Sequence, residues 1–393
     1  REQEQDVDGV RFVFYSTPGA EAPAEMTFSL PELKAFGGAE LLSQTLHNLY
    51  TLRGAKVRDA LQWANYIDAS RAQAAGAEVL FNQHHWPVWG QDNIQAFLTA
   101  QRDVYRYLHD QTVRLMNAGL TAPEIAEQLR LPASLDQHLH VHGYYGTLKH
   151  NVRAIYQFYL GWFDANPANL DPLPPVAAAA KYVALAGGSE PLLAAAEHAY
   201  AEGDYRWAAE LGKHLLYADP DNQGARDLQA RSFEQLGYQA ESAPWRNFYL
   251  SGAYELRHGL PEEGFTPVMM LDMLKHTAPE RFLDVMATKL DGTAAADSAL
   301  RINLNFTDSG ARFHLWIENA VLHHRRLDEG EVAEADASLN LSKDFFLQII
   351  SGQAGAAALL SSDQVSIDGN PLALGRFFSL LDQPDGRFPI VTR

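Results

Sequence analysis

The chain has 393 residues, of which 47% are hydrophobic and 20% charged. This balance is typical of a globular protein of two or three domains and argues against a disordered chain. The formal net charge is −18, from 31 basic and 49 acidic side chains, which argues against a nucleic-acid partner. There is no cysteine, so disulfides and thiolate metal sites are excluded and any metal must bind histidine or carboxylate side chains.

The sequence contains no apolar run of about 18 residues, so no membrane span is expected. The first residues, REQEQDVDGVRFVFYS, lack the features of a signal peptide and lead directly into an alternating stretch. Because the chain also starts without Met, we expect it to be a piece of a longer protein, and its compartment stays open, with a periplasmic or secreted location among the options.

Residues 1–90 have the pattern of an α/β domain. Alternating and apolar stretches predict strands at Val10–Tyr15 and Glu78–Phe81. Helical spacing predicts helices at Pro31–Leu42 and Lys56–Ala75, the first of them opened by its proline. Strands and helices mixed in this way favour a sheet covered by helices.

Residues 91–243 have an all-helical pattern. Apolar residues recur at helical spacing over Asn93–Asn117, and turn signals separate three further helical segments within Glu190–Ala240. The pattern from Gly203 to Leu228 is typical of a tetratricopeptide-type helix hairpin, of which only about one and a half repeats are present. We therefore expect a helical dimerisation or docking module rather than a solenoid.

Residues 244–393 favour an α+β unit. A methionine-rich helix is expected at Val268–Met273. The pattern then predicts strands at Leu300–Asn305, Arg312–Glu318 and Ala337–Leu341, and helices at Phe345–Ser351 and Leu372–Leu381. A small sheet with helices on one face follows from this order, and such a layout can enclose an apolar cavity.

Acidic residues and a histidine pair give the first region a potential metal site. Glu21 lies in the loop TPGAEAPAEM after the first predicted strand, and Glu40 lies on the following predicted helix. His84 and His85 stand at a strand end, where binding groups gather in open α/β sheets. Zinc accepts imidazole nitrogen and carboxylate oxygen. A solvated helix surface and a hydrogen-bonded core histidine fit the same residues, and spacing does not decide between these interpretations.

A local basic patch follows in the stretch HNLYTLRGAKVR. Arg53, Lys56 and Arg58 lie close together in the sequence, and Asn48 precedes them. Guanidinium groups offer paired donors to sulfate or phosphate, and the Asn48 amide adds another donor. The alternative is a set of surface charges paired with neighbouring acids such as Asp59.

A histidine triplet in the second region is a weaker candidate for metal binding. His138, His140 and His142 alternate, so on a strand all three would point the same way and suit zinc. Their loop-like flanks lie in a helical region, which favours surface histidines instead.

A second anion-binding motif overlaps the end of that triplet. A helix is predicted to start near Thr147, which places His150 in its first turns, where it can donate to an anion or protonate a leaving oxygen. Tyr145, in the preceding turn, can offer its hydroxyl to the same anion. A helix-surface histidine and a packed tyrosine fit the spacing equally well.

Four longer stretches of the chain form a set of motifs, namely PGAEAPAEM, LHNLYTLRGAKVRDALQW, AEVLFNQHHWPVWG and YYGTLKHNVRAIYQFYLGWFDANPA. Together they resemble one enzyme family, the zinc-dependent linear alkylsulfatases of the metallo-β-lactamase superfamily, which hydrolyse dodecyl sulfate. The resemblance covers essentially the whole chain and implies a mixed fold in three parts. These are the C-terminal part of a metallo-β-lactamase αββα domain over residues 1–90, an all-α dimerisation domain over 91–243, and an α+β sterol-carrier-protein-like domain over 244–393.

The resemblance also implies a catalytic site with two zinc ions. Glu21 and Glu40 match its two carboxylate ligands, with Glu40 as the bridging one, and His85 matches the final histidine ligand. Long-chain alkyl sulfate is the expected substrate and a homodimer the expected assembly. Asn48 and Arg53 match sulfate-binding residues, and His150 matches an active-site histidine that contacts sulfate or acts as an acid.

One motif of the superfamily, H-x-H-x-D-H, does not occur in the chain. We expect it upstream of Arg1, and we expect the chain alone to bind zinc poorly, because an incomplete site is desolvated without full coordination. Two other interpretations stay open. One is a non-catalytic lipid-binding or interaction protein, and the other is a different hydrolase of the same superfamily, acting on phosphate esters or lactams.

Overall fold

The computed structural model describes residues 2–264, 271–354, 362–382 and 386–392 of the chain. The chain divides into two compact units, one made of Arg1–Gly259 with Ile390–Arg393 and the other of Leu260–Pro389. Within the described ranges, no helix combines the length and the apolar composition that crossing a bilayer requires.

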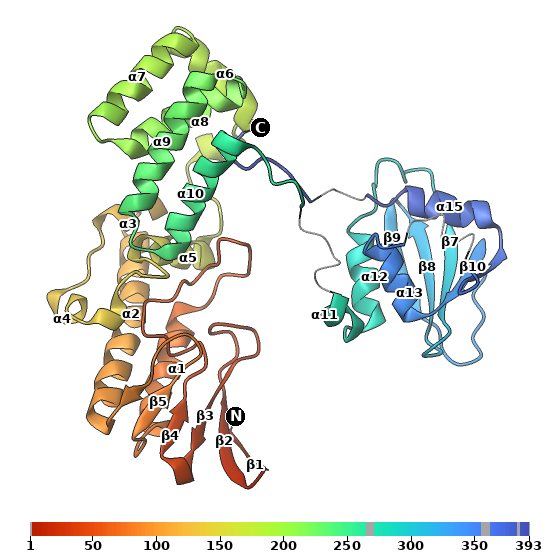
Figure 1. Ribbon diagram of the computed structural model, residues 1–393, viewed down its shortest axis with the longest axis horizontal. Coiled ribbons are helices and arrows are strands. Elements are labelled where there is room, and N and C mark those ends of the chain that lie inside the picture. Colours follow the sequence, from red (N-terminus) through yellow and green to blue (C-terminus); the bar gives the residue numbers. More distant parts are fainter. Residues whose placement is uncertain (1, 265–270, 355–361, 383–385, 393) are drawn as a thin grey trace. The chain divides into compact units, whose positions relative to one another are not determined.

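The first unit begins with a six-stranded sheet whose strands lie in chain order (Figure 1). The strands are β1 (Glu2–Val7), β2 (Val10–Ser16), β3 (Met26–Leu30), β4 (Ala35–Gly37), β5 (Val79–Phe81) and β6 (Val88–Trp89). All neighbours are antiparallel except β4 and β5, which are parallel because helix α1 (Ala60–Gln73) connects them as a crossover. The carboxyl ends of β4 and β5 therefore meet at one edge of the sheet.

The strands expected around Val10–Tyr15 and Glu78–Phe81 are confirmed by β2 and β5. The helix expected over Pro31–Leu42 is wrong beyond its first residues, because Pro31–Leu33 forms a single 3-10 turn and the chain then enters β4. Phe36 in β4 is fully buried between two ladders of backbone hydrogen bonds, to β3 and to β5. This pairing outweighs the helical spacing of the apolar side chains.

Helices α1 and α2 (Gln91–Asn117) pack against each other in the core of this unit. The Asp59 carboxylate caps α1 by accepting the Gln62 N–H at 3.0 Å, so the helix starts later than the sequence pattern predicts. The fully buried rings of Trp63 and Tyr105 stack with centroids 5.1 Å apart. Trp63 Nε1 also donates to the Leu41 carbonyl at 2.9 Å, which ties the turn after β4 to the core.

Short helices lead from α2 to a helical stack. They are α3 (Ala122–Gln128), α4 (Ala133–Asp136) and α5 (Leu148–Leu160), and α3 begins with a capping box of Thr121 and Glu124. The stack comprises α6 (Pro175–Leu185), α7 (Ser189–Ala201), α8 (Tyr205–Ala218), α9 (Gln223–Gln239) and α10 (Ala243–His258). Figure 1 shows these helices at the end of the unit away from the sheet. The helical character expected for this region is confirmed.

The end of the chain returns to the first unit. The backbone N–H groups of Ile390 and Val391 donate to the Glu255 carboxylate on α10 at 3.0–3.1 Å. Helix α10 packs on α9, so the first unit continues to Gly259. The functional domain boundaries expected near residues 90 and 243 stay predictions.

The second unit is a five-stranded sheet in the order β11-β10-β7-β8-β9. Its strands are β7 (Arg301–Phe306), β8 (Arg312–Glu318), β9 (Val321–Arg326), β10 (Ala337–Leu341) and β11 (Ser366–Gly369). Its helices are α11 (Leu271–Lys275), α12 (Pro279–Ala287), α13 (Lys343–Ile350) and α15 (Pro371–Ser379). The expected strands and helices are confirmed, β9 and β11 are additional, and the methionine-rich segment lies outside the described residues as far as residue 270.

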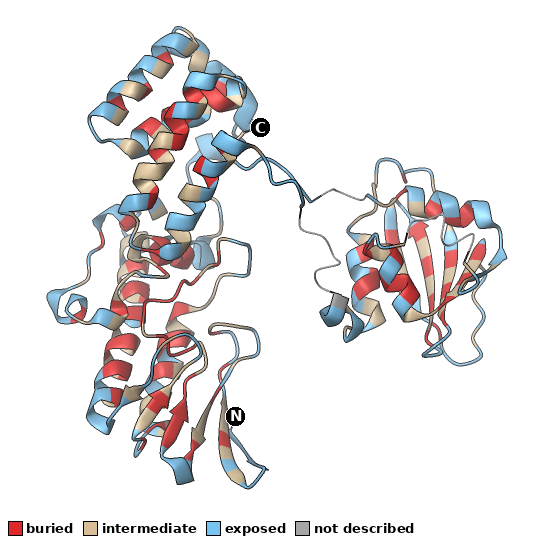
Figure 2. Ribbon diagram, viewed as in Figure 1, coloured by how far each residue is buried: buried red, intermediate tan, exposed pale blue. Residues whose placement is uncertain are grey.

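One face of this second sheet forms the core of the unit. Buried and partly exposed residues alternate along β7, β8 and β10, as the banded strands in Figure 2 show. The buried set packs against apolar side chains of α12, α13 and α15. Phe306 and Phe313 meet edge to face with centroids 5.9 Å apart at its centre.

Truncation of Phe313 should destabilise the second unit severely. Its side chain is fully buried, so Phe313→Ala leaves a cavity and is expected to cost about 3–5 kcal/mol in the free energy of unfolding measured with urea. Leu372→Ala, at a residue 81% exposed on α15, is the matched control and should change stability by less than about 0.5 kcal/mol. Equal effects of the two substitutions would contradict this description of the core.

Candidate metal centre

Three segments of the first unit bring carboxylates and an imidazole together. Glu21 lies in the loop between β2 and β3, Glu40 lies in the turn after β4, and His47 follows in the next loop. Their ligand atoms all lie within 4.8 Å of one another. Glu21 and Glu40 are partly buried and His47 is buried. The sequence predicted both carboxylates as ligands, and the structure brings them to one point.

A third glutamate organises the loops that carry this cluster. The two carboxylate oxygens of Glu25 accept backbone N–H groups from Glu21 at 3.0 Å, Glu40 at 3.0 Å and Leu41 at 2.9 Å. Burial raises the pKa of Glu25 to about 7, although the backbone donors favour its charged form. Glu25 therefore ties both carboxylate-bearing loops together. Sequence reasoning placed it in the right loop without giving it this role.

The His47 ring lies with Nδ1 near a backbone carbonyl and Nε2 toward the carboxylates. Its Nδ1 lies 3.0 Å from the Asn48 carbonyl oxygen, and its Nε2 lies 3.9 Å from Glu40 Oε2. Burial lowers the pKa of His47 to about 4, so the ring is neutral near neutral pH. Nδ1 also lies 3.3 Å from Arg58 Nη1, which can only donate, and in that contact Nδ1 accepts. The other tautomer, with Nδ1–H donating to the Asn48 carbonyl, leaves the Nε2 lone pair facing the carboxylates, as in a ligating histidine.

Arg58 neutralises part of the cluster. Its guanidinium forms an ion pair with Glu21, and Nη1 donates at 2.8 Å to both the backbone and the side-chain oxygen of Asn48. Partial burial raises the pKa of Glu21. For Glu40, burial acts in the same direction, but the interactions with His84, His47 and Glu21 together outweigh it and lower the pKa. Asn48 is itself buried, and its side-chain oxygen accepts the hydrogen bond from Arg58 beside the cluster.

His84 and His85, which follow β5, have different surroundings. His84 hydrogen-bonds Glu40 directly, although the sequence singled out His85 as the ligand. The backbone N–H groups of both residues donate to the Asn82 side chain, at 3.2 and 2.9 Å. His85 Nδ1 is buried and has no hydrogen-bond partner among the described residues. A buried imidazole nitrogen without a hydrogen-bond partner is available to bind a metal ion.

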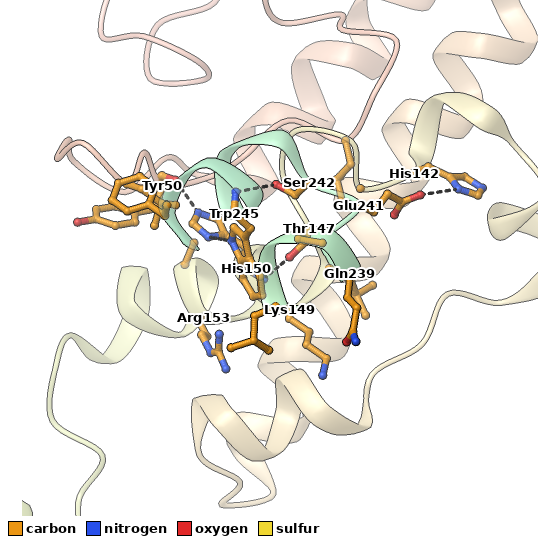
Figure 3. Close-up of a pocket in the computed structure, with 18 of the residues that line it drawn as sticks. Tyr50, His142, Thr147, Lys149, His150, Arg153, Gln239, Glu241, Ser242 and Trp245 are labelled. Carbon is orange, nitrogen blue, oxygen red and sulfur yellow. Dashed lines mark hydrogen bonds and ion pairs between the residues drawn. The ribbon is translucent and has the colours of Figure 1, made fainter. Parts of the chain in front are cut away.

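Of the other predicted site residues, Tyr145 contacts the cluster, whereas no hydrogen bond, ion pair or ring contact among the described residues joins Arg53 or His150 to it. The Tyr145 ring packs against the His47 ring with centroids 4.9 Å apart. Arg53 is exposed, and the structure gives it no ion pair within the described part of the chain. His150, on α5, is buried: Trp245 Nε1 donates to its Nδ1 at 3.2 Å, and its Nε2 lies 2.6 Å from the Tyr50 carbonyl oxygen (Figure 3).

The triplet of alternating histidines forms no strand. His138 and His140 stack with ring centroids 5.4 Å apart, and the region is a 3-10 turn between short helices. His142 lies 3.5 Å from a Glu241 carboxylate oxygen and hydrogen-bonds the Asp136 carbonyl at 2.9 Å. The loop interpretation of this stretch is therefore the correct one.

The donor set of the cluster fits a divalent metal. Two carboxylates and a neutral imidazole face one another, and this is the oxygen and nitrogen chemistry that zinc accepts. A cavity of about 580 Å³ adjoins it, lined by Glu21, Glu25 and Glu40 on its polar side and by Phe14, Phe28 and Phe81 on its apolar side.

Comparison with known proteins gives consistent matches. The alkyl sulfatase dimerisation model matches residues 121–259, and the alkyl sulfatase C-terminal model matches residues 267–393. A linear primary-alkylsulfatase of Pseudomonas sp. (strain ATCC 19151) is 36% identical over 399 residues, 98% of this chain and 74% of its own length. The alkyl/aryl-sulfatase BDS1 of Saccharomyces cerevisiae (strain ATCC 204508 / S288c) is 45% identical over 390 residues, 99% of this chain and 60% of its own.

A solved structure agrees with these relatives. The stereoselective inverting sec-alkylsulfatase Pisa1 from Pseudomonas sp. matches with a TM-score of 0.92 and 42% identity, over 100% of this chain and 62% of its own. The chain thus spans less than two thirds of the length of this structure and of the yeast relative. The mixed fold class expected from the sequence, α/β followed by helices and then α+β, is confirmed.

A glycine holds the His47 segment against the loop before α5. Gly146 N–H donates to the Leu46 carbonyl at 2.8 Å, and a Cβ on Gly146 would lie 2.5 Å from the His47 carbonyl oxygen. Gly146→Ala should therefore push His47 away and cost about 1–3 kcal/mol in urea unfolding. Gly375→Ala, on α15 with open space around its Cβ, should be neutral or slightly stabilising. Unchanged stability of Gly146→Ala would contradict the close approach.

Proposed function

The chain belongs to the alkylsulfatase family, and we propose that its protein hydrolyses long-chain alkyl sulfate esters to the alcohol and inorganic sulfate. Family membership implies a metal cofactor, and zinc, as two ions, is part of the proposal. The observation that carries it is the convergence of Glu21 and Glu40 with a neutral imidazole in a protein of this family.

We propose Glu21, Glu40 and His85 as ligands that this chain supplies, and the geometry adds His47 to the set. The buried Nδ1 without a partner supports the assignment of His85 as a ligand, and the Nε2 that faces Glu40 supports the assignment of His47. When bound, zinc supplies Lewis acidity for the ester and lowers the pKa of water. Arg58 reduces the repulsion within the set by neutralising Glu21.

Sulfate recognition is proposed for Asn48, Arg53 and Tyr145. Asn48 and Tyr145 both contact groups of the cluster, through Arg58 and the His47 ring respectively. Arg53 lies on the same loop with its guanidinium exposed, and an unpaired guanidinium offers two parallel donors to an oxyanion. In a protein of net charge −18, such a local cation is what holds a sulfate ester near carboxylates.

His150 is proposed to contact sulfate or donate a proton, and its present bonds set a condition for that role. Because Trp245 Nε1 can only donate, His150 Nδ1 accepts, and the proton of the neutral ring lies on Nε2, facing the Tyr50 carbonyl. Burial lowers the pKa of His150. The ring must exchange the Tyr50 carbonyl for the substrate before it can transfer that proton.

We further propose a homodimer formed through the helical part. Large apolar side chains are exposed from the end of α5 through α6, namely Phe158, Tyr159, Leu160, Trp162, Leu170, Leu173, Val176, Tyr182 and Leu185. An exposed apolar surface of this extent marks an interaction site. All of these residues fall within residues 121–259, where the dimerisation model matches.

Charges placed on this surface should separate the subunits. Trp162 and Leu185 are 71% and 84% exposed, so Trp162→Asp with Leu185→Asp should leave the fold intact and give a monomer in sedimentation equilibrium at micromolar concentration. Val332→Asp, at a residue 90% exposed in the second unit, is the control and should remain dimeric. A dimer that survives the double substitution would place the interface elsewhere.

Removal of the Glu40 carboxylate should abolish activity. For the protein expressed from its native gene with zinc, Glu40→Gln should lower sulfate release from decyl sulfate at least about 100-fold and reduce bound zinc. Glu78→Gln, which alters only an exposed ion pair with Lys34, should retain activity. A chelator should abolish activity, and zinc should restore it.

A substrate panel separates the proposed function from its rivals. Decyl sulfate should be hydrolysed faster than decyl phosphate or a lactam. Preferential cleavage of the phosphate ester or the lactam would reassign the chemistry, and absence of both zinc and hydrolysis would favour a non-catalytic protein.

A further inference from the structure

A second cavity of the first unit shares the His47 segment with the carboxylate cluster. It has a volume of about 930 Å³, within the range of small-molecule sites, and it is lined by α5, α9, α10 and residues 46–57 (Figure 3). Leu46 and Tyr50 line it, whereas His47 and Asn48 between them face the cluster. The segment of residues 46–57 thus lines the cavity and also contributes residues to the carboxylate cluster.

Most of the lining is apolar. Leu46, Leu52, Val57, Leu148, Leu236 and Phe248 contribute side chains from segments far apart in the sequence. Polar groups inside it already have partners: His150 binds Trp245 and the Tyr50 carbonyl, and the Ser242 hydroxyl donates to the Tyr145 carbonyl at 2.6 Å. The interior therefore offers apolar contact with few free hydrogen-bonding groups, which suits a hydrocarbon chain.

Cations gather at the cavity even though the protein is strongly acidic. Arg130, Lys149, Arg153 and Arg206 line it, against the carboxylates of Asp136 and Glu241. Figure 3 shows Lys149 and Arg153 extending from α5 on the same side of the pocket. An excess of positive charge at one apolar cavity, within a chain of net charge −18, favours an anionic ligand there.

Arg130 and Arg153 lack a carboxylate partner within the described residues, whereas the other two cations are paired. Lys149 and Arg206 share Glu127, at 2.9 and 3.2 Å. Arg130 donates only to backbone carbonyls, and Arg153 lies over the Trp245 ring with its guanidinium carbon 6.0 Å from the centroid. Arg153 is also exposed, so its donors remain available to an anion.

We propose that this cavity binds a single-chain anionic amphiphile, with the hydrocarbon chain in the apolar interior and the anionic head at Arg153. An alkyl sulfate has this chemistry, and its identification with the substrate rests on the proposed function. The binding itself does not, because it depends only on the cavity and its cations. Bound here, the head of an alkyl sulfate lies at Arg153, rather than at Asn48, Arg53 and Tyr145.

Alkanesulfonates of eight, ten and twelve carbons test the proposal, since they have the same form as alkyl sulfates but contain no ester to hydrolyse. Titration calorimetry of the full chain below the critical micelle concentration should give about fourfold tighter binding for each added methylene. A failure of the hydrolysis assays would leave this measurement unaffected, so the two proposals are tested separately.

A cavity-filling variant locates the bound chain. Ala240 lines the cavity and is only partly buried, so Ala240→Phe should fill it, weaken decanesulfonate binding at least tenfold and flatten the chain-length dependence. Ala195→Phe adds the same ring at an exposed position of α7 outside the cavity and should bind like the parent protein. Equal affinity of Ala240→Phe and the parent, with both folded by circular dichroism, would overturn the proposal.

A substitution that removes the charge of Arg153 tests where the anionic head of the amphiphile binds. Arg153→Gln should weaken decanesulfonate binding about fivefold and reduce its dependence on salt, while leaving 1-decanol binding unchanged. Because Arg153 is exposed, this variant should fold normally even if the cavity-filling variant does not. Undiminished decanesulfonate affinity, or an equal loss for the sulfonate and the alcohol, would overturn the assignment of the head to Arg153.

Discussion

Three glutamates share one partly buried corner of the first unit, and their negative charge has to be compensated for the corner to be stable. Glu25 is held by three backbone N–H groups, and Glu21 is held by Arg58. Glu40 is held by His84. The ligand atoms of Glu21, Glu40 and His47 lie within 4.8 Å of one another, and a divalent metal is the group that this geometry and the neutral His47 suit.

The segment of residues 46–58 connects this corner to the rest of the unit. Asn151 on α5 accepts the Leu49 N–H at 2.9 Å and donates to the His47 carbonyl at 2.9 Å, so the helix holds the segment by its backbone. Gly146 approaches the same carbonyl from the next loop. With its backbone fixed in this way, the segment presents polar side chains to the carboxylates and apolar side chains to the large cavity.

Local sequence patterns predicted the strands around Glu21 and His85 and the helical middle region, because neighbouring residues determine these elements. The helix over Pro31–Leu42 was wrong because sheet pairing of β4 depends on β5, which is distant in the sequence. Motif resemblance predicted that Glu21 and Glu40 share one site, and the structure brings them together. The presence of His47 beside them was not predicted, because its position depends on packing against Tyr145 and α5. The large cavity was invisible for the same reason, since its walls come from separated segments.

Anomalous diffraction at the zinc edge, from crystals of the protein expressed from its native gene and grown with zinc, tests the central claim most directly. The account predicts a zinc peak within about 2.0–2.2 Å of carboxylate oxygens of Glu21 and Glu40, with a nitrogen of His47 or His85 in the same coordination sphere. A peak only at His138–His142, or no ordered zinc at saturating concentration, would contradict it.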